Sequence, residues 1–262
     1  MSGYNIDWLI KKFDNGEQPR FLFFWGHTNK NKEDKGIGKI IFSQWYDSPF
    51  TVDDITYPTT EHWMMAWKAS LFGDKPVFDK ILKTTKPAEA KELGRQVRNF
   101  DEIVWNKRKF EIVKLGNIHK FNQDPGLLKY LLGTGDQILV EASPVDSIWG
   151  IGLAQDAEMI ENPYSWNGQN LLGFALMEVR DFFNVFGQFN YANAEMLPPW
   201  KKYPGIDPLG MHWRMGGGEE YMVQLGKGYR RMSKRDQTIF DLSYPAMWEW
   251  AGYHEGDWWV IK

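Results

Sequence analysis

The chain has 262 residues, of which 43% are hydrophobic and 25% charged, enough for one large folded domain or one domain with a small addition. Its formal net charge of −3 argues against a general attraction to nucleic acid, and the absence of cysteine excludes disulfides, thiolate zinc sites and cysteine nucleophiles. The sequence shows no signal-peptide core and no run of about 18 apolar residues, so we expect a cytoplasmic protein that does not enter a membrane.

The first predicted elements are one short helix and three strands. Residues 5–13 predict a helix with Asn5 as its N-cap. Short apolar segments bounded by glycine or proline then predict strands within 20–26, 38–46 and 48–58.

The middle of the chain is predicted to be helical, because its apolar residues recur at helical spacing. The expected helices cover 59–72, 87–97, 101–121, 125–132 and 169–186, and a buried strand is expected at 136–143. Early strands, central helices and one late strand predict an α+β fold that is mostly helical with a small sheet.

The helix expected at 59–72 carries charges on an otherwise apolar surface. Glu61 and Lys68 lie seven residues apart and share one face with Met65. Their backbones are roughly 10 Å apart along the axis, and a lysine side chain leans back toward the N-terminus. The two groups can therefore border one pocket.

Two explanations of these charges remain open. Glu61 is favoured near a helix start by the helix dipole, and Lys68 could extend to solvent. A charge among large apolar neighbours is costly unless it is paired or used, however, and burial lowers the pKa of a lysine and so favours a nucleophilic amine. His62 is either a hydrogen-bonded structural residue or a part of the same site. No metal-ligand spacing is present.

Other candidates suit a phosphorylated ligand. Arg95 and Arg98 carry forked donors that match phosphate, although either could belong to a solvated helix face. Ser43 could donate a hydroxyl to phosphate or form a turn. Trp149 and Gly150 open a long loop, 149–168, where glycine permits close approach of a ligand and tryptophan can stack on a base. The alternative for Trp149 is a place in the core.

Blocks along most of the chain resemble the NADAR family of NAD- and ADP-ribose-associated proteins, which includes YbiA-like N-glycosidases. The blocks are FFWGH, FSQWYDSPF, YPTTEHWMMAWKASLFGD, AKELGRQVRNFDEIVW, LLGTGDQILVEASPVDSIWGIGL and WNGQNLLGFALMEVR. They run in order from about Arg20 to Phe183. Several blocks together are far more specific than any single motif.

The resemblance implies cleavage of an N-glycosidic bond to a phosphate-bearing ribose. Lys68 matches the family lysine that forms a Schiff base with ribose C1″, and Glu61 matches the glutamate of the family's EH pair. Trp149 matches the tryptophan of the family's WG pair. A further family block matches Gly168, Asn170, Leu172 and Gly173. Under this interpretation Lys68 is the nucleophile and Glu61 the acid and base, with no cofactor.

Three functions are compatible with these residues. The first is an N-glycosidase that removes ADP-ribose from guanine bases, with ADP-ribosylated DNA or RNA as possible partners. The second is an N-glycosidase of phosphoribosylaminopyrimidine intermediates of riboflavin synthesis. The third is a module that binds ADP-ribose or a nucleotide without turnover, which would not need Glu61 and Lys68 together.

The expected organisation is an N-terminal extension at 1–19, a NADAR-like domain at 20–186 and a C-terminal annex at 187–262. The annex begins with a segment rich in Pro, Gly and Asn and contains the block WRMGGGEEY, to which no role is assigned. Its basic residues Lys227, Arg230, Arg231, Lys234 and Arg235 predict a solvated helix face or, alternatively, a contact to nucleic-acid phosphates.

Overall fold

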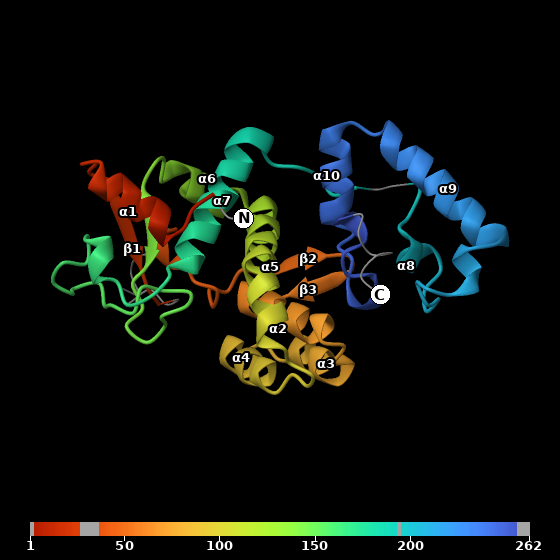
Figure 1. Cartoon of the computed structure of the whole chain (residues 1–262), viewed down its shortest axis with the longest axis horizontal. Coiled ribbons are helices and arrows are strands. Elements are labelled where there is room, and N and C mark those ends of the chain that lie inside the picture. Colours follow the sequence, from red (N-terminus) through yellow and green to blue (C-terminus); the bar gives the residue numbers. More distant parts are fainter. Residues whose placement is uncertain (1–2, 27–36, 193–194, 256–262) are drawn as a thin grey trace.

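The computed structural model describes residues 3–26, 37–192 and 195–255. In this part of the chain the protein is mostly helical, with two sheets of two strands each (Figure 1). The α+β fold expected from the sequence is thus confirmed. No helix among the described residues combines the length and apolar character needed to cross a membrane.

The N-terminal helix and the sheet behind it agree with the sequence. Helix α1 (Ile6–Asp14) begins where the Asn5 side chain accepts a hydrogen bond from the Trp8 amide. Strand β1 (Phe21–Phe24) pairs in parallel with β4 (Ile138–Glu141), although more than a hundred residues separate them. This pairing fixes the end of β4, which carries Glu141.

The strand expected at 38–46 is wrong. Residues Lys39–Phe42 form a short 3-10 helix, η1. The buried amine of Lys120 lies 2.5 Å from the carbonyl oxygen of Ile41 and 3.3 Å from that of Ser43. These carbonyl groups therefore find a donor without a neighbouring strand.

The segment at 48–58 forms a hairpin where the sequence analysis expected one strand. Strands β2 (Phe50–Val52) and β3 (Ile55–Tyr57) are antiparallel. The two residues between them, Asp53 and Asp54, have positive φ angles of 51° and 64°. Positive φ at both central residues is the requirement of a type I′ hairpin turn, which aspartate tolerates.

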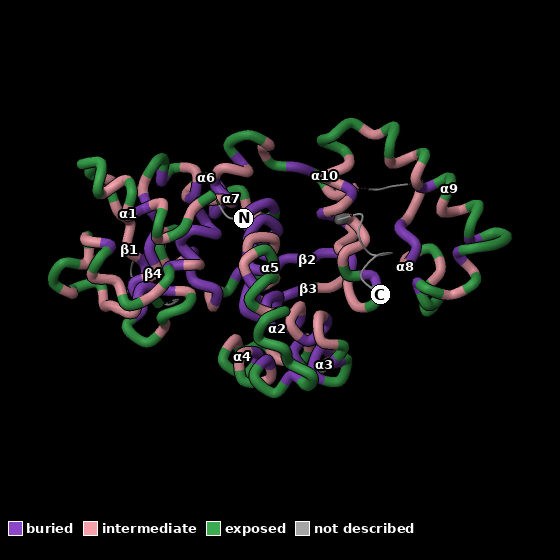
Figure 2. Tube along the Cα trace, viewed as in Figure 1, coloured by how far each residue is buried: buried purple, intermediate pink, exposed green. Residues whose placement is uncertain are grey.

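The helical part matches the prediction except for one additional helix. Its members are α2 (Thr60–Leu71), α3 (Lys75–Lys83), α4 (Pro87–Arg95), α5 (Glu102–Gln123), α6 (Pro125–Gly133) and α7 (Leu171–Phe186). Helix α3 was not predicted; Asp74 caps it by accepting a hydrogen bond from the Val77 amide. Helix α5 runs through the middle of the molecule, and α2 packs against α3, α4 and α5 (Figures 1 and 2).

The annex adds α8 (Pro199–Lys202), α9 (Gly216–Arg231) and α10 (Lys234–Ser243). It has a small core of its own around Trp213, Ala246 and Trp250. Phe189 and Leu242 instead belong to the main core. The β2–β3 hairpin points toward the annex (Figure 1), where the Lys201 amine lies 2.7 Å from Asp53 and 2.8 Å from Asp54.

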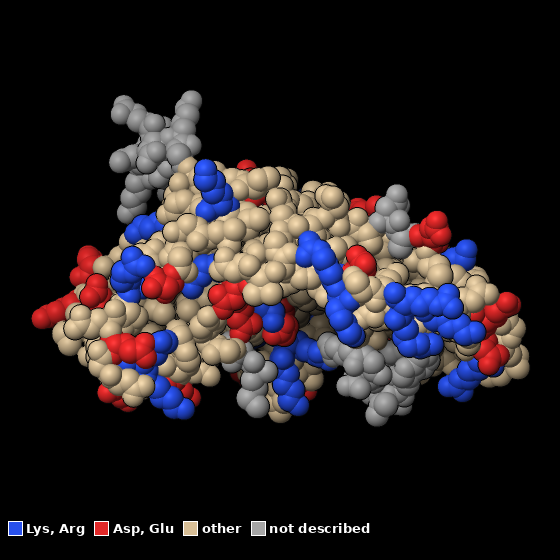
Figure 3. All heavy atoms as spheres, turned by 90° about the horizontal axis from the view of Figure 1, so that it is seen from above, with Lys and Arg blue, Asp and Glu red and all other residues tan. Residues whose placement is uncertain are grey.

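The basic residues of the annex do not all face solvent. Arg235 donates to the carbonyl oxygen of Phe186, and its guanidinium lies 4.2 Å from the centre of the Phe186 ring. It therefore helps to attach α10 to the end of α7. Figure 3 shows basic side chains gathered toward the annex end of one face, with acidic side chains close by. Because basic and acidic side chains are mixed there, we propose no nucleic-acid site on this surface.

Candidate active site

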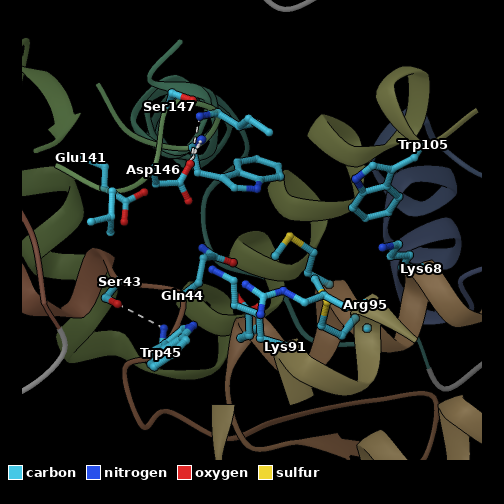
Figure 4. A pocket seen from close by; sticks show the side chains of 17 residues that line it. Ser43, Gln44, Trp45, Lys68, Lys91, Arg95, Trp105, Glu141, Asp146 and Ser147 are labelled. Carbon is cyan, nitrogen blue, oxygen red and sulfur yellow. Dashed lines mark hydrogen bonds between the residues drawn. The ribbon is translucent and has the colours of Figure 1, made fainter. Parts of the chain in front are cut away.

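A cavity of about 370 Å³ lies among α2, α4, the start of α5 and the segment that follows β4 (Figure 4). This volume falls within the usual range for small-molecule sites. Five residues singled out in the sequence line the cavity, namely Ser43, Glu61, Lys68, Arg95 and Trp149. The seven-residue spacing on α2 thus brings Glu61 and Lys68 to the same cavity.

Glu61 lies in the first turn of α2 and is only 3% exposed. Burial raises the pKa of its carboxyl to about 7, opposed by the charge of Lys91 and by a hydrogen bond from Trp45. Its oxygen Oε1 has no hydrogen-bond partner among the described residues. A buried carboxyl that carries a proton near neutral pH suits a general acid.

Lys68 is half-buried, and burial lowers the pKa of its amine. Its Nζ lies 4.2 Å from the centre of the Phe100 ring and 5.6 Å from that of Trp105. In Figure 4, Lys68 and Trp105 are at the opposite end of the cavity from Glu141. The cavity therefore has an amine end and a carboxyl end.

Glu141 is a site residue that the sequence analysis missed. It ends β4, and its buried oxygen Oε2 has no hydrogen-bond partner in the described part of the chain. Burial, followed by the charges of Asp146 and Glu61, raises the pKa of Glu141 to about 8. The available signal was an acidic residue at the end of a buried strand, because side chains at strand ends often face a site.

Further residues that line the cavity were not predicted from the sequence. Both polar atoms of the Gln44 side chain are buried without partners among the described residues. Lys91 lies 5.9 Å from the centre of the Trp45 ring and stabilises the charged forms of Glu61 and Glu141. Buried polar groups without partners are costly, so the amide atoms of Gln44 are suited to bind a polar ligand.

Trp149 is held in place by a neighbouring aspartate. Asp146 Oδ1 accepts hydrogen bonds from the Ile148 amide at 2.9 Å and from the Trp149 amide at 2.8 Å. On the other side, the Ser43 hydroxyl accepts a hydrogen bond from the Trp45 amide at 3.1 Å (Figure 4). Two tryptophans from distant parts of the chain are thus fixed at one cavity.

Arg98 and His62, two candidates for binding substrate, do not line the cavity. Arg98 forms an ion pair with Asp74 at 2.9 Å. His62 is fully buried; burial lowers its pKa, and its Nδ1 lies 2.8 Å from the Thr59 hydroxyl. Both side chains bond to neighbouring parts of the protein.

Asn170 and Gly150 also have structural positions. Asn170, in a left-handed conformation before α7, accepts a hydrogen bond from the Glu141 amide and donates one to the Leu139 carbonyl oxygen. A Cβ on Gly150 would lie 2.8 Å from the Glu141 carbonyl oxygen, so the close approach there is to the chain itself. Both residues support the strand end that presents Glu141.

The long loop contributes less to the cavity wall than expected. Of residues 149–168, only Trp149 lines the cavity. Farther along, Tyr164 donates a hydrogen bond to Asp14, and the Trp166 indole donates one to the Ile160 carbonyl oxygen. These contacts attach the loop to α1 and to itself.

Comparison with known proteins adds independent information. A family model described as the NADAR domain matches residues 23–184. An N-glycosidase of Acanthamoeba polyphaga mimivirus is 48% identical over 172 residues, covering 63% of this chain and 97% of that protein. A "Riboflavin biosynthesis protein" of Vibrio vulnificus is 29% identical over 159 residues, covering 60% of this chain and 40% of that protein.

The fold is shared with a solved structure. The NMR structure of the Escherichia coli protein YbiA superimposes with a TM-score of 0.52 at 24% sequence identity, covering 68% of this chain and 94% of that one. The region matched by the family model contains every residue that lines the cavity and ends before the annex.

Proposed function

Because this chain belongs to the NADAR family, we propose that it is an N-glycosidase that hydrolyses the bond between a base amine and ribose, with ADP-ribosylated guanine as its substrate. The observation that carries the proposal is the shared cavity of Glu61 and Lys68, which combines a buried carboxyl and a half-buried amine. The names of its relatives support the reaction class.

The chemistry can be assigned to two groups that line the cavity, Glu61 and Lys68. A ribose attached to an exocyclic amine is a glycosylamine. Its ring opens when the C1″–O4″ bond breaks, the ring oxygen takes a proton from Glu61, and the lone pair of the base nitrogen forms C1″=N. Lys68, as the neutral amine, then adds to C1″.

The remaining steps return both groups to their starting states. A proton transfers from the lysine nitrogen to the base nitrogen, the C1″–base bond breaks, and the base leaves as a free amine while Lys68 retains C1″ as an imine. Water adds to this imine and expels the Lys68 amine, and the aldehyde closes to ribose. Glu61 recovers its proton, so the net reaction consumes one water.

The cavity also has groups suited to the rest of the ligand. Lys91 and Arg95 line the cavity and can donate to the phosphates, Arg95 by exchanging its exposed ion pair with Glu92 (3.1 Å), and Trp45 and Trp149 offer ring faces for stacking. A second candidate substrate is a phosphoribosylaminopyrimidine, favoured by the likeness to the Vibrio vulnificus protein named for riboflavin biosynthesis. The two substrates share the glycosylamine bond and differ in the size of the sugar phosphate.

The test is product analysis by mass spectrometry after incubation with an ADP-ribosylated guanine oligonucleotide and, separately, with phosphoribosylaminopyrimidine. We expect free ADP-ribose from the first. Borohydride added during turnover should reduce the imine and attach the sugar phosphate to the Lys68 peptide. Lys68→Ala should abolish adduct and turnover, and Lys68→Arg should not restore them, because arginine stays protonated.

Lys83→Ala, on the exposed face of α3, is the matched control and should retain both adduct and turnover. Fast turnover by Lys68→Ala, with unmodified Lys68 in the wild type, would exclude the imine route. Release of the base would then depend on direct attack by water, with Glu61 as the catalytic group. Absence of turnover with both substrates would contradict the proposed function itself.

A further inference from the structure

The amine of Lys68 lies against aromatic rings from two different elements. Its Nζ is 4.2 Å from the centre of the Phe100 ring and 5.6 Å from that of Trp105. An ammonium within about 6 Å of a ring centre is attracted by the negative face of the ring, whereas a neutral amine lacks this attraction. The two rings therefore favour the protonated form of Lys68 and define where it lies.

Phe100 is placed over Lys68 by an unusual turn. Its side chain remains 45% exposed, although its ring packs edge-on against Phe72 at 5.3 Å. The preceding residue, Asn99, has a φ of +56°, a left-handed conformation that few residue types adopt without cost. Hydrophobic burial alone does not explain why this exposed ring is held 4.2 Å from the Lys68 amine.

Arg98 and Asp74 fix that turn. Asp74, 1% exposed, accepts hydrogen bonds from the Arg98 amide at 2.9 Å, from Nε at 3.0 Å and from Nη2 at 2.9 Å. The pairing, chiefly the side-chain hydrogen bonds from Arg98, lowers the pKa of Asp74 to about 2, so the pair stays charged at neutral pH. Three bonds to one carboxylate hold both the backbone and the side chain of the residue two positions before Phe100.

Trp105 supplies the second ring near the Lys68 amine. It lies at the start of α5, where its amide donates to the Asp101 carbonyl oxygen at 2.9 Å. The Asp101 side chain also caps this helix by accepting a hydrogen bond from the Val104 amide. The ring of Trp105 lines the cavity at the amine end (Figure 4).

We propose that Phe100 and Trp105 form an aromatic cradle that positions the Lys68 amine and holds it as an ammonium in the resting enzyme, and that the Arg98–Asp74 pair keeps Phe100 in the cradle. Phe100 and Trp105 are positioning residues, since they act through Lys68. The inference rests on the proposed function only in taking Lys68 as the nucleophile.

The cradle sets how many enzyme molecules are ready to react. Burial favours the neutral amine and the rings favour the ammonium, and the proton must pass to water before the nitrogen lone pair can attack. The charged groups that face the same cavity are Glu61 from α2, Lys91 and Arg95 from α4, Glu141 from β4 and Asp146 from the segment after it. All of them remain in the variants below, so a change can be assigned to the rings.

The protonation of Lys68 can be measured without any substrate. The full-length chain is acylated with a limiting amount of an amine reagent across a pH series, and the Lys68 peptide is quantified by mass spectrometry. Phe100→Leu and Trp105→Leu keep apolar bulk but lack a π face. In both variants the pH midpoint of Lys68 acylation should fall by about 0.5 pH. This shift corresponds to about threefold more neutral amine at a given pH below the midpoint. Turnover should nevertheless fall, because the amine loses its fixed position.

Two controls separate the cradle from a general effect on packing. Phe100→Tyr keeps a π face and should restore the wild-type midpoint. Phe182→Leu removes a half-buried ring from α7, outside the cavity lining, and should leave the midpoint unchanged. An unchanged midpoint in both cradle variants, or an equal change in Phe182→Leu, would overturn the cradle.

The Arg98–Asp74 pair, which acts as a clamp on the turn before Phe100, has its own test. Arg98→Ala should lower the Lys68 midpoint in the same direction as Phe100→Leu, and the double variant should show no further change, because both act through one ring. Additive changes would contradict a clamp that works through Phe100. If borohydride gives an adduct on Lys68 but the acylation midpoint does not change in the variants, the cradle alone is refuted. If the midpoints change as expected but no adduct forms, the proposed chemistry alone is refuted.

Discussion

The carboxyl of Glu61 is buried, where ionising it costs free energy. It is 3% exposed, and burial is the main cause of its pKa of about 7. Because this value is above that of the unfolded chain, the folded protein retains a proton that the unfolded chain has lost. Stability therefore falls as the pH rises from about 4.5 to about 7, and it stays reduced at higher pH.

We accordingly expect Glu61→Gln to be more stable than the wild type at pH 8.5, by on the order of 2–3 kcal/mol, and to gain little at pH 4. The same change should slow turnover by about 10²–10⁴-fold, because the proton donor is lost, while binding persists. Urea unfolding at both pH values and steady-state kinetics measure the two effects.

Glu158→Gln is the matched control, because Glu158 is exposed on the long loop. Its unfolding free energy should change by less than about 0.5 kcal/mol at either pH. If Glu61→Gln were equally destabilising at both pH values, the buried carboxyl would stabilise the fold through a hydrogen bond, and its ionisation would not reduce the stability of the wild type.

Helical spacing predicted that Glu61 and Lys68 meet at one cavity, because both belong to one element. Glu141 could not be found in this way, since its position depends on the parallel pairing of β1 with β4. Arg98 was a candidate phosphate ligand because of its forked donors, and Asn170 was a candidate because a family block matches it. In the fold their donors bond to Asp74 and to β4, which a sequence without contacts cannot indicate.

At the scale of elements, the packing of α2, which carries the site, against α5 includes one close contact. The Trp63 indole on α2 donates to the Ile112 carbonyl oxygen at 2.8 Å, and its ring lies against Gly116 of α5. A Cβ at Gly116 would come 2.4 Å from the ring. The contact between α2 and α5 therefore requires a residue without a side chain.

Gly116→Ala should destabilise the protein by about 1–3 kcal/mol, because the ring and both helices must shift to admit a methyl group. Gly133→Ala, at the end of α6, is the matched control. No atom lies within 4 Å of its added Cβ, so its effect should be small. Chemical unfolding of both variants measures the difference. Equal stability would mean that the α2–α5 contact is loose, and the position of Lys68 would then need another support.

The elements that the sequence analysis got wrong have tertiary causes. The segment at 38–46 has the apolar pattern of a strand, but Lys120, from the last turn of α5, supplies the donor for two of its carbonyl groups. Helix α3 is short and begins at a cap, Asp74, whose carboxylate also holds Arg98. Neither the buried lysine nor the shared carboxylate can be recognised from neighbouring residues.

At the scale of the whole molecule, the annex contacts the catalytic part at two places, one around Phe189 and one around Trp248. Phe189 is 6% exposed, and its amide and carbonyl oxygen both bond to the Asn122 side chain at 2.9 Å. Farther along, the Trp248 amide donates to the Ser70 hydroxyl on α2, and its ring packs against Phe78 at 4.9 Å. We propose that the catalytic unit includes the segment around Phe189, and that the rest of the annex supports it from outside.

Two truncations test this arrangement. A chain of residues 1–192 keeps every residue that lines the cavity and keeps Phe189, so it should fold and still hydrolyse the substrate, although with lower stability because Trp248 and Leu242 no longer cover the main core. A chain of residues 1–186 also loses Phe189, whose burial is worth about 1.5–3 kcal/mol, and leaves the buried Asn122 without its partners.

We therefore expect thermal unfolding to rank the full chain above 1–192, and 1–192 above 1–186, while kcat for the 1–192 chain stays within about tenfold of the full chain because no catalytic group has been removed. Such a modest loss would reflect a small displacement of α2 after its contact with Trp248 is gone. Complete loss of turnover in a 1–192 chain that still unfolds cooperatively would show that the annex supplies a group or a constraint that the reaction requires.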